Sequence, residues 1–233
     1  MNMKKSNNSL KAALFPRKCF ICGDFTVSPY CLCDECSTKF NMIYENTCKS
    51  CGLTVNFCQC EEYCYHFESV VGAFKNEGAP QNGIYALKFG GKIDAANYYG
   101  EILSQIISKK YRGIDFDVIT EIPMTAISKR GRGYNQAELI AKVIGKKLNI
   151  PHQSLLKKRM FVKTQHNLSR DDRFFNIFGK FKIANGVTIR GKRVLLCDDI
   201  KTTGATLDEA ARILRLAGAK EVWCATALIT YKF

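Results

Sequence analysis

The stretch Val194-Leu-Leu-Cys-Asp-Asp-Ile-Lys-Thr-Thr-Gly-Ala-Thr206 decides the fold of the C-terminal part of the chain. Its apolar start predicts a buried strand over 193–197, and the small residues that follow predict a turn that opens a helix over 206–217. A strand that runs through such a turn into a helix is typical of a parallel α/β sheet. The backbone N–H groups and hydroxyls of the turn, together with the helix dipole, can bind a phosphate.

Two acids, Asp198 and Asp199, stand between this strand and the turn. Their carboxylates are placed to accept hydrogen bonds from the two hydroxyls of a ribose, or to hold a Mg²⁺ ion bound to the sugar. The alternative is an ordinary strand-to-helix turn with solvated acids. The residues predicted to surround the phosphate are Lys201, Thr202, Thr203, Gly204, Ala205 and Thr206.

Within this turn, Gly204 lets the backbone come close to an anion. Lys201 either adds a contact to the phosphate or points to solvent. The turn is not a Walker A loop, because Gly-x4-Gly-Lys-Ser/Thr is absent, and it is not a dinucleotide fingerprint, because Gly-x-Gly-x2-Gly is missing.

Hydrophobic periodicity extends the same architecture back to about residue 65. Apolar segments alternate between the periods of strands and helices, which predicts an α/β fold with a mostly parallel sheet covered on both faces. The predicted strands are 67–74, 117–122 and 221–229, and the predicted helices are 82–88, 95–110 and 135–148.

Two basic segments lie near the predicted phosphate site. Lys129, Arg130 and Arg132 follow the strand at 117–122 and could bind a pyrophosphate, or form a solvated basic turn. The stretch 157–173 has no clean period and predicts a long mobile loop, which could close over the pyrophosphate or remain a solvated charged loop. The candidate ligands in this loop are Lys163, Arg170 and Arg173.

Ten of the 12 cysteines lie between Cys19 and Cys64, in four closely spaced groups. A Cys-x2-Cys turn directs two thiolates to one point, and two such turns complete a tetrahedral zinc shell. The pattern predicts an N-terminal module of one or two zinc ribbons, because a region this small needs the metal in order to fold. The predicted ligands are Cys19, Cys22, Cys33, Cys36, Cys48, Cys51, Cys60 and Cys64.

Some of this zinc assignment stays open. The last group has irregular spacing, so that Cys60 pairs with either Cys58 or Cys64, and the pairs could be interleaved rather than sequential. The composition change near residue 65 predicts three parts: a basic segment over 1–18, the cysteine module over 19–65 and the α/β domain over 66–233.

Lys and Arg outnumber Asp and Glu by 35 to 21, a net charge of +14. Such an excess indicates polyanionic partners, and a solvated basic surface is the equal alternative. Tyr134 and Phe161 stand among the cations and could stack on the bases of a single strand, or anchor a loop to the core. No secretory signal and no run approaching about 18 apolar residues is visible. We therefore expect a cytoplasmic protein without membrane insertion, whose clustered cysteines hold metal rather than disulfides.

Several motifs in a fixed order resemble one family. They are the cysteine pairs, Leu87-Lys-Phe-Gly-Gly-Lys92, Ile122-Pro-Met124, Arg130-Gly-Arg-Gly-Tyr-Asn-Gln-Ala137, Gln165-His-Asn-Leu-Ser-Arg170 and Cys197-Asp-Asp-Ile-Lys-Thr-Thr-Gly-Ala-Thr206. The last is similar to the phosphoribosyl-pyrophosphate (PRPP) loop of type I phosphoribosyltransferases, and the whole series is similar to the ComF family. The chain departs from the family at its irregular last cysteine group and at Lys201.

The resemblance implies a zinc-binding module, a phosphoribosyltransferase-type domain that binds PRPP with Mg²⁺, and a role in DNA uptake during natural transformation. Single-stranded DNA and a ComFA-like helicase at the inner face of the membrane are the implied partners. The alternative is a Mg²⁺-dependent phosphoribosyltransferase that acts on an unknown nitrogenous acceptor in metabolism, stabilising the leaving pyrophosphate with the cations described above.

Overall fold

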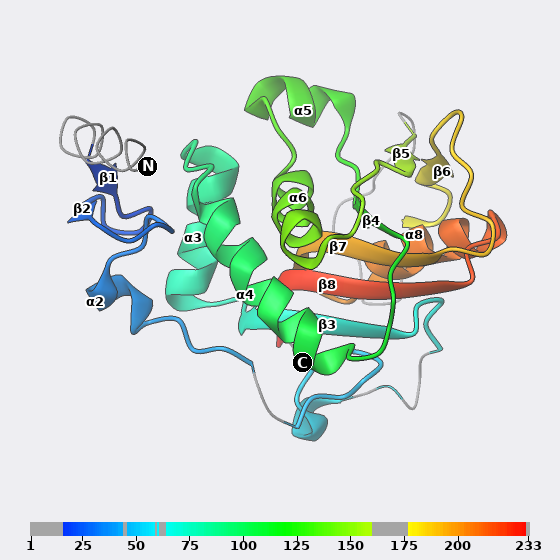
Figure 1. Cartoon of the computed structure of the whole chain (residues 1–233), viewed down its shortest axis with the longest axis horizontal. Helices are drawn as coiled ribbons and strands as arrows, with labels where there is room; N and C mark the ends of the chain where they lie inside the picture. Colours follow the sequence, from blue (N-terminus) through cyan, green and yellow to red (C-terminus); the bar gives the residue numbers. More distant parts are fainter. Residues whose placement is uncertain (1–15, 44–45, 59, 61–63, 160–176, 232–233) are drawn as a thin grey trace, which may run out of the picture.

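Four parallel strands form the central sheet of the protein (Figure 1). The structure is a computed structural model that describes residues 16–43, 46–58, 60, 64–159 and 177–231. Because the strands are parallel, their carboxyl ends meet at one edge, where an α/β sheet places its ligands. In spatial order the strands are β3 (Ser69–Lys75), β8 (Glu221–Ile229), β7 (Arg193–Lys201) and β4 (Val118–Glu121).

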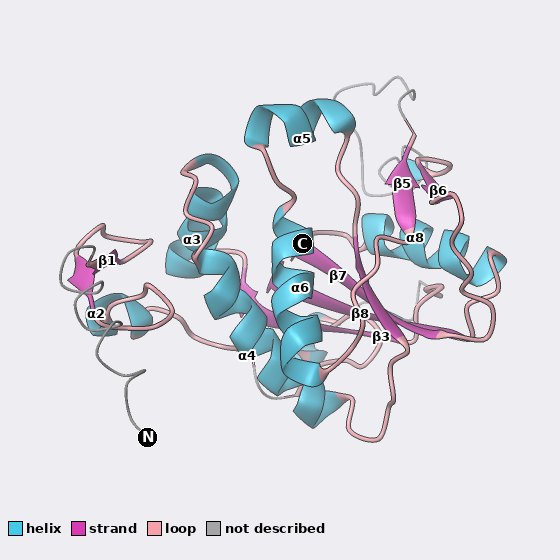
Figure 2. Ribbon diagram, turned by 45° about the horizontal axis from the view of Figure 1, so that its top comes forward, coloured by secondary structure: helices cyan, strands magenta, loops and turns pink. Residues whose placement is uncertain are grey.

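Helices cover both faces of this sheet (Figure 2). Helices α3 (Gly78–Phe89), α4 (Ala95–Lys110) and α6 (Gln136–Leu148) pack on one face. Helix α8 (Ala205–Leu216) packs on the other, because its Leu207, Ala210, Ala211 and Leu214 form one buried helical stripe. The hairpin of β5 (Leu156–Lys158) and β6 (Phe181–Ile183) lies on the α8 side.

The N-terminal cysteine module contains only short elements, namely β1 (Arg17–Lys18), β2 (Phe25–Thr26), α2 (Asp34–Ser37) and the 3₁₀ helix η1 (Val55–Phe57). Aromatic side chains join it to the α/β core. The ring of Phe40 makes edge contacts with Phe74 of β3 and Tyr98 of α4, at centroid distances of 5.3 and 5.1 Å. Phe20 packs against the same group, so the module shares one hydrophobic core with the sheet.

The predicted α/β fold with a mostly parallel sheet is confirmed, and the helix at 95–110 and the strand at 221–229 have the predicted bounds. Three local predictions differ from the structure. The helix predicted at 82–88 is longer, because α3 begins at Gly78. The strand at 193–197 continues to Lys201, because Asp198 to Lys201 still pair with β8. The basic turn at 129–132 is the end of a helix, α5 (Ala126–Arg132), which begins at a Thr125 cap and ends at Gly133 with φ 84°.

Among the described residues, no helix combines the length and the apolar character needed to cross a membrane.

Candidate functional site

Asp198 and Asp199 lie in the last part of β7, at the carboxyl edge of the sheet. Asp198 pairs with Thr226 of β8, and its Oδ1 accepts a hydrogen bond of 2.8 Å from the backbone N–H of Asp199. The other acid is held from outside the strand, since Oδ2 of Asp199 lies 2.9 Å from Nζ of Lys88, at the end of α3. The two adjacent carboxylates therefore have different partners.

The surroundings of Asp198 favour its protonated form. Although the residue keeps some solvent exposure, desolvation of its carboxyl and the charge of Asp199 raise the pKa of Asp198 to about 8. A divalent cation or a hydrogen-bond donor that replaces the proton would relieve both effects. The pair is thus electrostatically suited to a cation or to the hydroxyls of a sugar.

The turn after β7 opens helix α8 at Gly204. Gly204 has a φ of 91°, a conformation that other residues rarely adopt, and it occupies the N-cap position of α8. Oγ1 of Thr203 accepts a hydrogen bond of 3.3 Å from the backbone N–H of Ala205. Thr202 is exposed, whereas Ala205 is buried at the start of the helix. The turn brings backbone N–H groups and hydroxyls to a helix N-terminus, an arrangement that favours anions.

Lys201 is buried, with 3% of its surface exposed, so it does not point to solvent. Its Cε lies 3.2 Å from the position that a side chain at Gly204 would take, and Cε1 of Tyr65 lies 3.4 Å from the same position. The lysine side chain therefore packs against the turn itself. Of the two roles left open by the sequence, solvation is wrong, and contact with a phosphate stays a prediction.

A neighbour of the turn that sequence reasoning missed comes from the segment before β3. The backbone N–H of His66 donates to Oδ1 of Asp208 in α8 at 2.6 Å, and the His66 ring nitrogen Nδ1 lies 3.1 Å from the same oxygen. These residues are 142 positions apart, so a local sequence pattern cannot predict the contact. The segment that follows the cysteine module is thus hydrogen-bonded to the first turns of α8, the helix that follows the candidate phosphate turn.

The three cations predicted for pyrophosphate lie on α5 and differ in their surroundings. Nζ of Lys129 forms an ion pair of 3.2 Å with Glu138 of α6. Arg132 donates to Oε1 of Gln136 at 2.7 Å. Arg130 is exposed, and no carboxylate of the described residues lies within ion-pair distance of it. Arg132 lines a cavity together with Lys88, the partner of Asp199.

The rest of the Arg130–Ala137 motif has structural roles. The Tyr134 hydroxyl donates to the Leu87 carbonyl, so this aromatic residue anchors the loop. Anchoring is one of the two roles that the sequence leaves open for Tyr134, and stacking on a base is the other. Asn135 caps α6 by accepting from the Ala137 N–H at 3.1 Å, and its Nδ2 donates to the Ile122 carbonyl after β4. The motif fixes α5 and α6 relative to the carboxyl end of β4.

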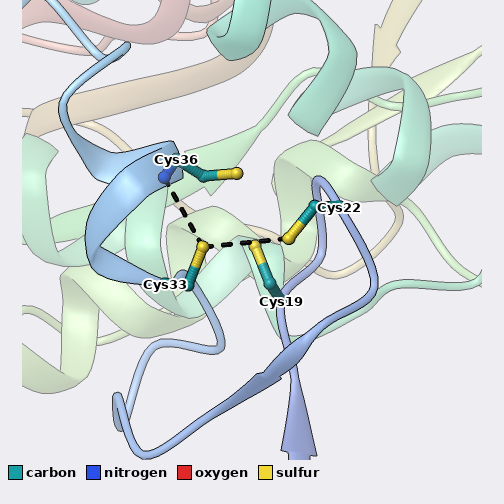
Figure 3. A group of neighbouring side chains, drawn as sticks. All are labelled: Cys19, Cys22, Cys33 and Cys36. Carbon is teal, nitrogen blue, oxygen red and sulfur yellow. Dashed lines mark hydrogen bonds between the residues drawn. The ribbon is translucent and has the colours of Figure 1, made fainter.

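Cys19, Cys22, Cys33 and Cys36 direct their sulfurs to one point (Figure 3). The Sγ atoms of Cys22 and Cys33 are 3.8 Å apart. A zinc tetrahedron with Zn–S bonds of about 2.3 Å has edges of about 3.8 Å, so the group fits zinc. Burial raises the pKa of the Cys19 thiol, but hydrogen bonds from the Cys33, Cys22 and Ile21 backbone outweigh it and lower the pKa to about 6, which favours the metal-binding thiolate.

A second group contains Cys48, Cys51, Cys58 and Cys60, with Sγ–Sγ distances of 3.7 and 3.8 Å. The predicted ligand Cys64 is exposed and lies outside it, so Cys58 replaces Cys64 as the fourth ligand. Cys58 follows η1 directly, and its Sγ lies 3.8 Å from that of Cys51. Both groups are sequential rather than interleaved, and each is built for a structural zinc with no open position.

Lys163, Arg170 and Arg173, the candidate ligands of the predicted mobile loop, lie outside the described residues, as does Phe161.

Comparisons with known proteins agree with these two parts of the chain. A sequence model described as a phosphoribosyl transferase domain matches residues 135–230, and a double zinc ribbon domain matches residues 10–68. The competence protein ComFC of Streptococcus pneumoniae is 30% identical over 223 residues, which cover 88% of this chain and 96% of that protein. The chain belongs to the ComF family.

Other ComF relatives match over shorter stretches. Competence protein F of Haemophilus influenzae is 35% identical over 108 residues, or 46% of this chain and 47% of that protein. Among solved structures, the glutamine PRPP amidotransferase of B. subtilis, complexed with ADP and GMP, shares 26% identity over 56% of this chain and 25% of that chain, with a TM-score of 0.37. The family assignment rests on the full-length relative and on the two domain matches.

Proposed function

We propose that this chain acts in DNA uptake, because its relatives include proteins named for competence. We also propose that its phosphoribosyltransferase-type site binds PRPP with Mg²⁺. The observation that carries the proposal is the sequence of β7, two acids, a Gly204 turn and helix α8, in a chain of the ComF family. Asp198 and Asp199 would hold the ribose or its Mg²⁺, and residues 201–206 would hold the 5′-phosphate.

The pyrophosphate of PRPP would lie between this turn and α5. Lys129, Arg130 and Arg132 are proposed to bind it, since cations on a neighbouring element can neutralise the diphosphate. Lys88 would be released from Asp199 when Mg²⁺ takes over the carboxylate. The loop that contains Lys163, Arg170 and Arg173 is proposed to close over the ligand.

The proposed polymeric partner is single-stranded DNA. A net charge of +14 attracts polyanions, and the relatives include proteins named for competence and for DNA utilization. A ComFA-like helicase at the inner face of the membrane would be a protein partner. We propose that residues 19–65 form a module stabilised by two zinc ions, that 66–233 form the PRPP-binding domain, and that 1–18 is a basic extension.

Calorimetric titration of PRPP in the presence of Mg²⁺ tests the central proposal. Asp199→Asn should weaken PRPP binding by about tenfold or more, because it removes a charged ligand of the ribose site. Asp115→Asn is the matched control, since Asp115 is an exposed acid that precedes β4 and therefore lies toward the opposite edge of the sheet. Equal PRPP affinity of the two variants would exclude the acid pair from the site.

A phosphoribosyltransferase activity on a nitrogenous acceptor is the second candidate, favoured by the phosphoribosyl transferase domain match over 135–230. Release of pyrophosphate from PRPP with candidate acceptors would test it. If the wild type binds PRPP but releases no more pyrophosphate than an Asp198→Asn/Asp199→Asn double variant, the site binds PRPP without transferring it.

A further inference from the structure

Two aromatic side chains lie exposed side by side at the end of α3. Phe89 keeps 75% of its surface exposed and Tyr85 keeps 44%, and their ring centroids are 6.2 Å apart. The residues are one helical turn apart, so both rings lie on the same side of α3. An exposed aromatic pair of this kind costs solvation free energy and indicates a surface that binds something flat or apolar.

The guanidinium of Arg132 reaches this pair from α5, with its Cζ 5.0 Å from the centre of the Phe89 ring. Its hydrogen-bond partner is the neutral oxygen of Gln136. Within the described parts of the chain, no carboxylate lies at ion-pair distance from Arg132. The positive charge beside Phe89 therefore remains available to an anion.

A second Arg–Phe pair in the molecule shows what a purely structural pair looks like. Arg212 lies 4.4 Å from the centre of the exposed Phe178 ring, but it forms two hydrogen bonds, of 2.7 and 2.9 Å, with the carboxylate of Glu209. Its charge is already neutralised. The Phe89–Arg132 pair differs in this respect, although both rings are similarly exposed.

A cavity of about 500 Å³ adjoins the Phe89 ring. Lys88, Phe89 and Gly91 line it from the α3 side, and Ser128, Gly131 and Arg132 line it from the α5 side. Nζ of Lys88 is also the group that lies 2.9 Å from Asp199, so the cavity borders the candidate ribose site. Its volume is large enough for a nucleobase, and it combines an aromatic wall with cations.

We propose that Tyr85, Phe89 and the cavity beside them bind single-stranded nucleic acid, with bases stacked on the rings and phosphates on Lys92 and on Arg132 and Arg130, two cations that this surface shares with the proposed pyrophosphate site. This inference rests on the proposed DNA-uptake function and assigns its strand to one surface of the molecule. Stacking on aromatic rings flanked by cations is the usual means of binding single strands without sequence preference, and it requires unpaired bases.

Charge argues for a nucleic-acid strand rather than a protein segment as the occupant. Lys92 and Arg130 are exposed near this surface and have no ion-pair partner among the described carboxylates. Two acids lie close to these residues in the chain. Glu138 already forms ion pairs with Lys129 and Lys142, and Asp94 is exposed. The net excess is positive, as a phosphate backbone requires.

The test compares two exposed phenylalanines by the binding of a short fluorescein-labelled oligothymidylate. Phe89→Ala should weaken strand binding by about fivefold or more, which is the loss expected for one stacked base. Phe178→Ala, the matched control with an arginine over its ring, should leave binding within about twofold of the wild type. An unlabelled duplex of the same length should compete more weakly than the single strand, because its bases are paired.

Each outcome has one meaning. If the wild type does not bind the oligonucleotide, the DNA part of the proposed function fails. If the wild type binds and Phe89→Ala equals Phe178→Ala, or if the duplex competes equally well, DNA binding stands but this surface is not its site. Titration of the Phe89→Ala variant with PRPP shows whether its candidate ribose site is intact. If PRPP binding by Phe89→Ala also falls, strand binding is measured with Tyr85→Ala instead, since Tyr85 does not line the cavity next to Lys88. Weaker strand binding by Tyr85→Ala then supports this surface, and unchanged strand binding excludes it.

Discussion

In the protein without ligand, the ionised carboxyl of Asp198 lowers the stability of the fold. The proposed ligand would remove this destabilisation. The unperturbed pKa of the group is 3.8, and the fold raises the pKa to about 8. Between these values the folded chain binds more protons than the unfolded chain, so the contribution of this residue to stability falls as pH rises through that interval. A residue that destabilises its own fold near neutral pH is typical of a binding site rather than of a structural one.

Asp198→Asn should therefore make the protein more stable and less able to bind PRPP. We expect the variant to have a higher melting temperature than the wild type at about pH 8, and a similar one at about pH 4, where the wild-type carboxyl is protonated in the folded state. The side-chain oxygen of asparagine can keep the hydrogen bond from the Asp199 N–H. Thermal unfolding across this pH range, beside PRPP titrations, provides the measurement. A melting temperature that differs from the wild type by the same amount at both pH values would contradict the raised pKa.

The acids and the turn could be predicted from the sequence because their chemistry is local. Asp198, Asp199 and Gly204 stand within seven positions, and a strand followed by a helix fixes their arrangement. Lys88 and His66 could not be assigned their contacts in the same way. Each reaches the site from a distant part of the chain, 111 positions from Asp199 and 142 from Asp208, and only the order of the strands brings them there.

At the scale of elements, predictions succeeded where burial imposes a period. Helix α4 buries Leu103, Ile106 and Ile107 along one face, and its predicted bounds are correct. Helix α5 buries no residue, so its sequence has no hydrophobic period, and its glycine, its three cations and the Gly133 that follows it resemble a loop. Its helical form depends instead on the Thr125 cap and on ties to α6, which sequence patterns of this kind do not reveal.

The second zinc group provides a prediction at this scale. Cys58→Ser should lower the zinc content from two ions per chain to about one, because it removes one of four thiolates from a closed site. Cys64→Ser, a cysteine close in sequence but outside the group, should keep both ions. Zinc content of the purified variants, measured by atomic absorption, distinguishes them. Loss of zinc from Cys64→Ser with full retention in Cys58→Ser would reverse the assignment.

At the scale of the whole molecule, the aromatic cluster decides whether the zinc module and the α/β domain fold as one unit. Phe20 and Phe40 enter the cluster from the module, and Phe74, Tyr98 and Tyr99 enter it from the domain. The sequence indicates the two parts by their composition, but nothing local specifies that their aromatic residues meet. A second tie between the two parts is the hydrogen bond from the His66 N–H to Asp208 of α8, the helix that follows the candidate phosphate turn.

Phe40→Ala tests this coupling. The side chain is 7% exposed and contacts rings of both parts, so its removal should lower the free energy of unfolding by about 3–5 kcal/mol. Phe25→Ala, at a ring in the same module that is 68% exposed, should lower it by less than about 1 kcal/mol. Urea unfolding followed by Trp223 fluorescence and by far-ultraviolet circular dichroism measures both. If the module and the domain form one cooperative unit, the Phe40→Ala midpoint shifts equally for the two probes, because Trp223 lies in β8 of the sheet and reports on the domain. A shift seen by circular dichroism alone would mean that the module unfolds separately, and that the cluster joins two parts without coupling their stabilities.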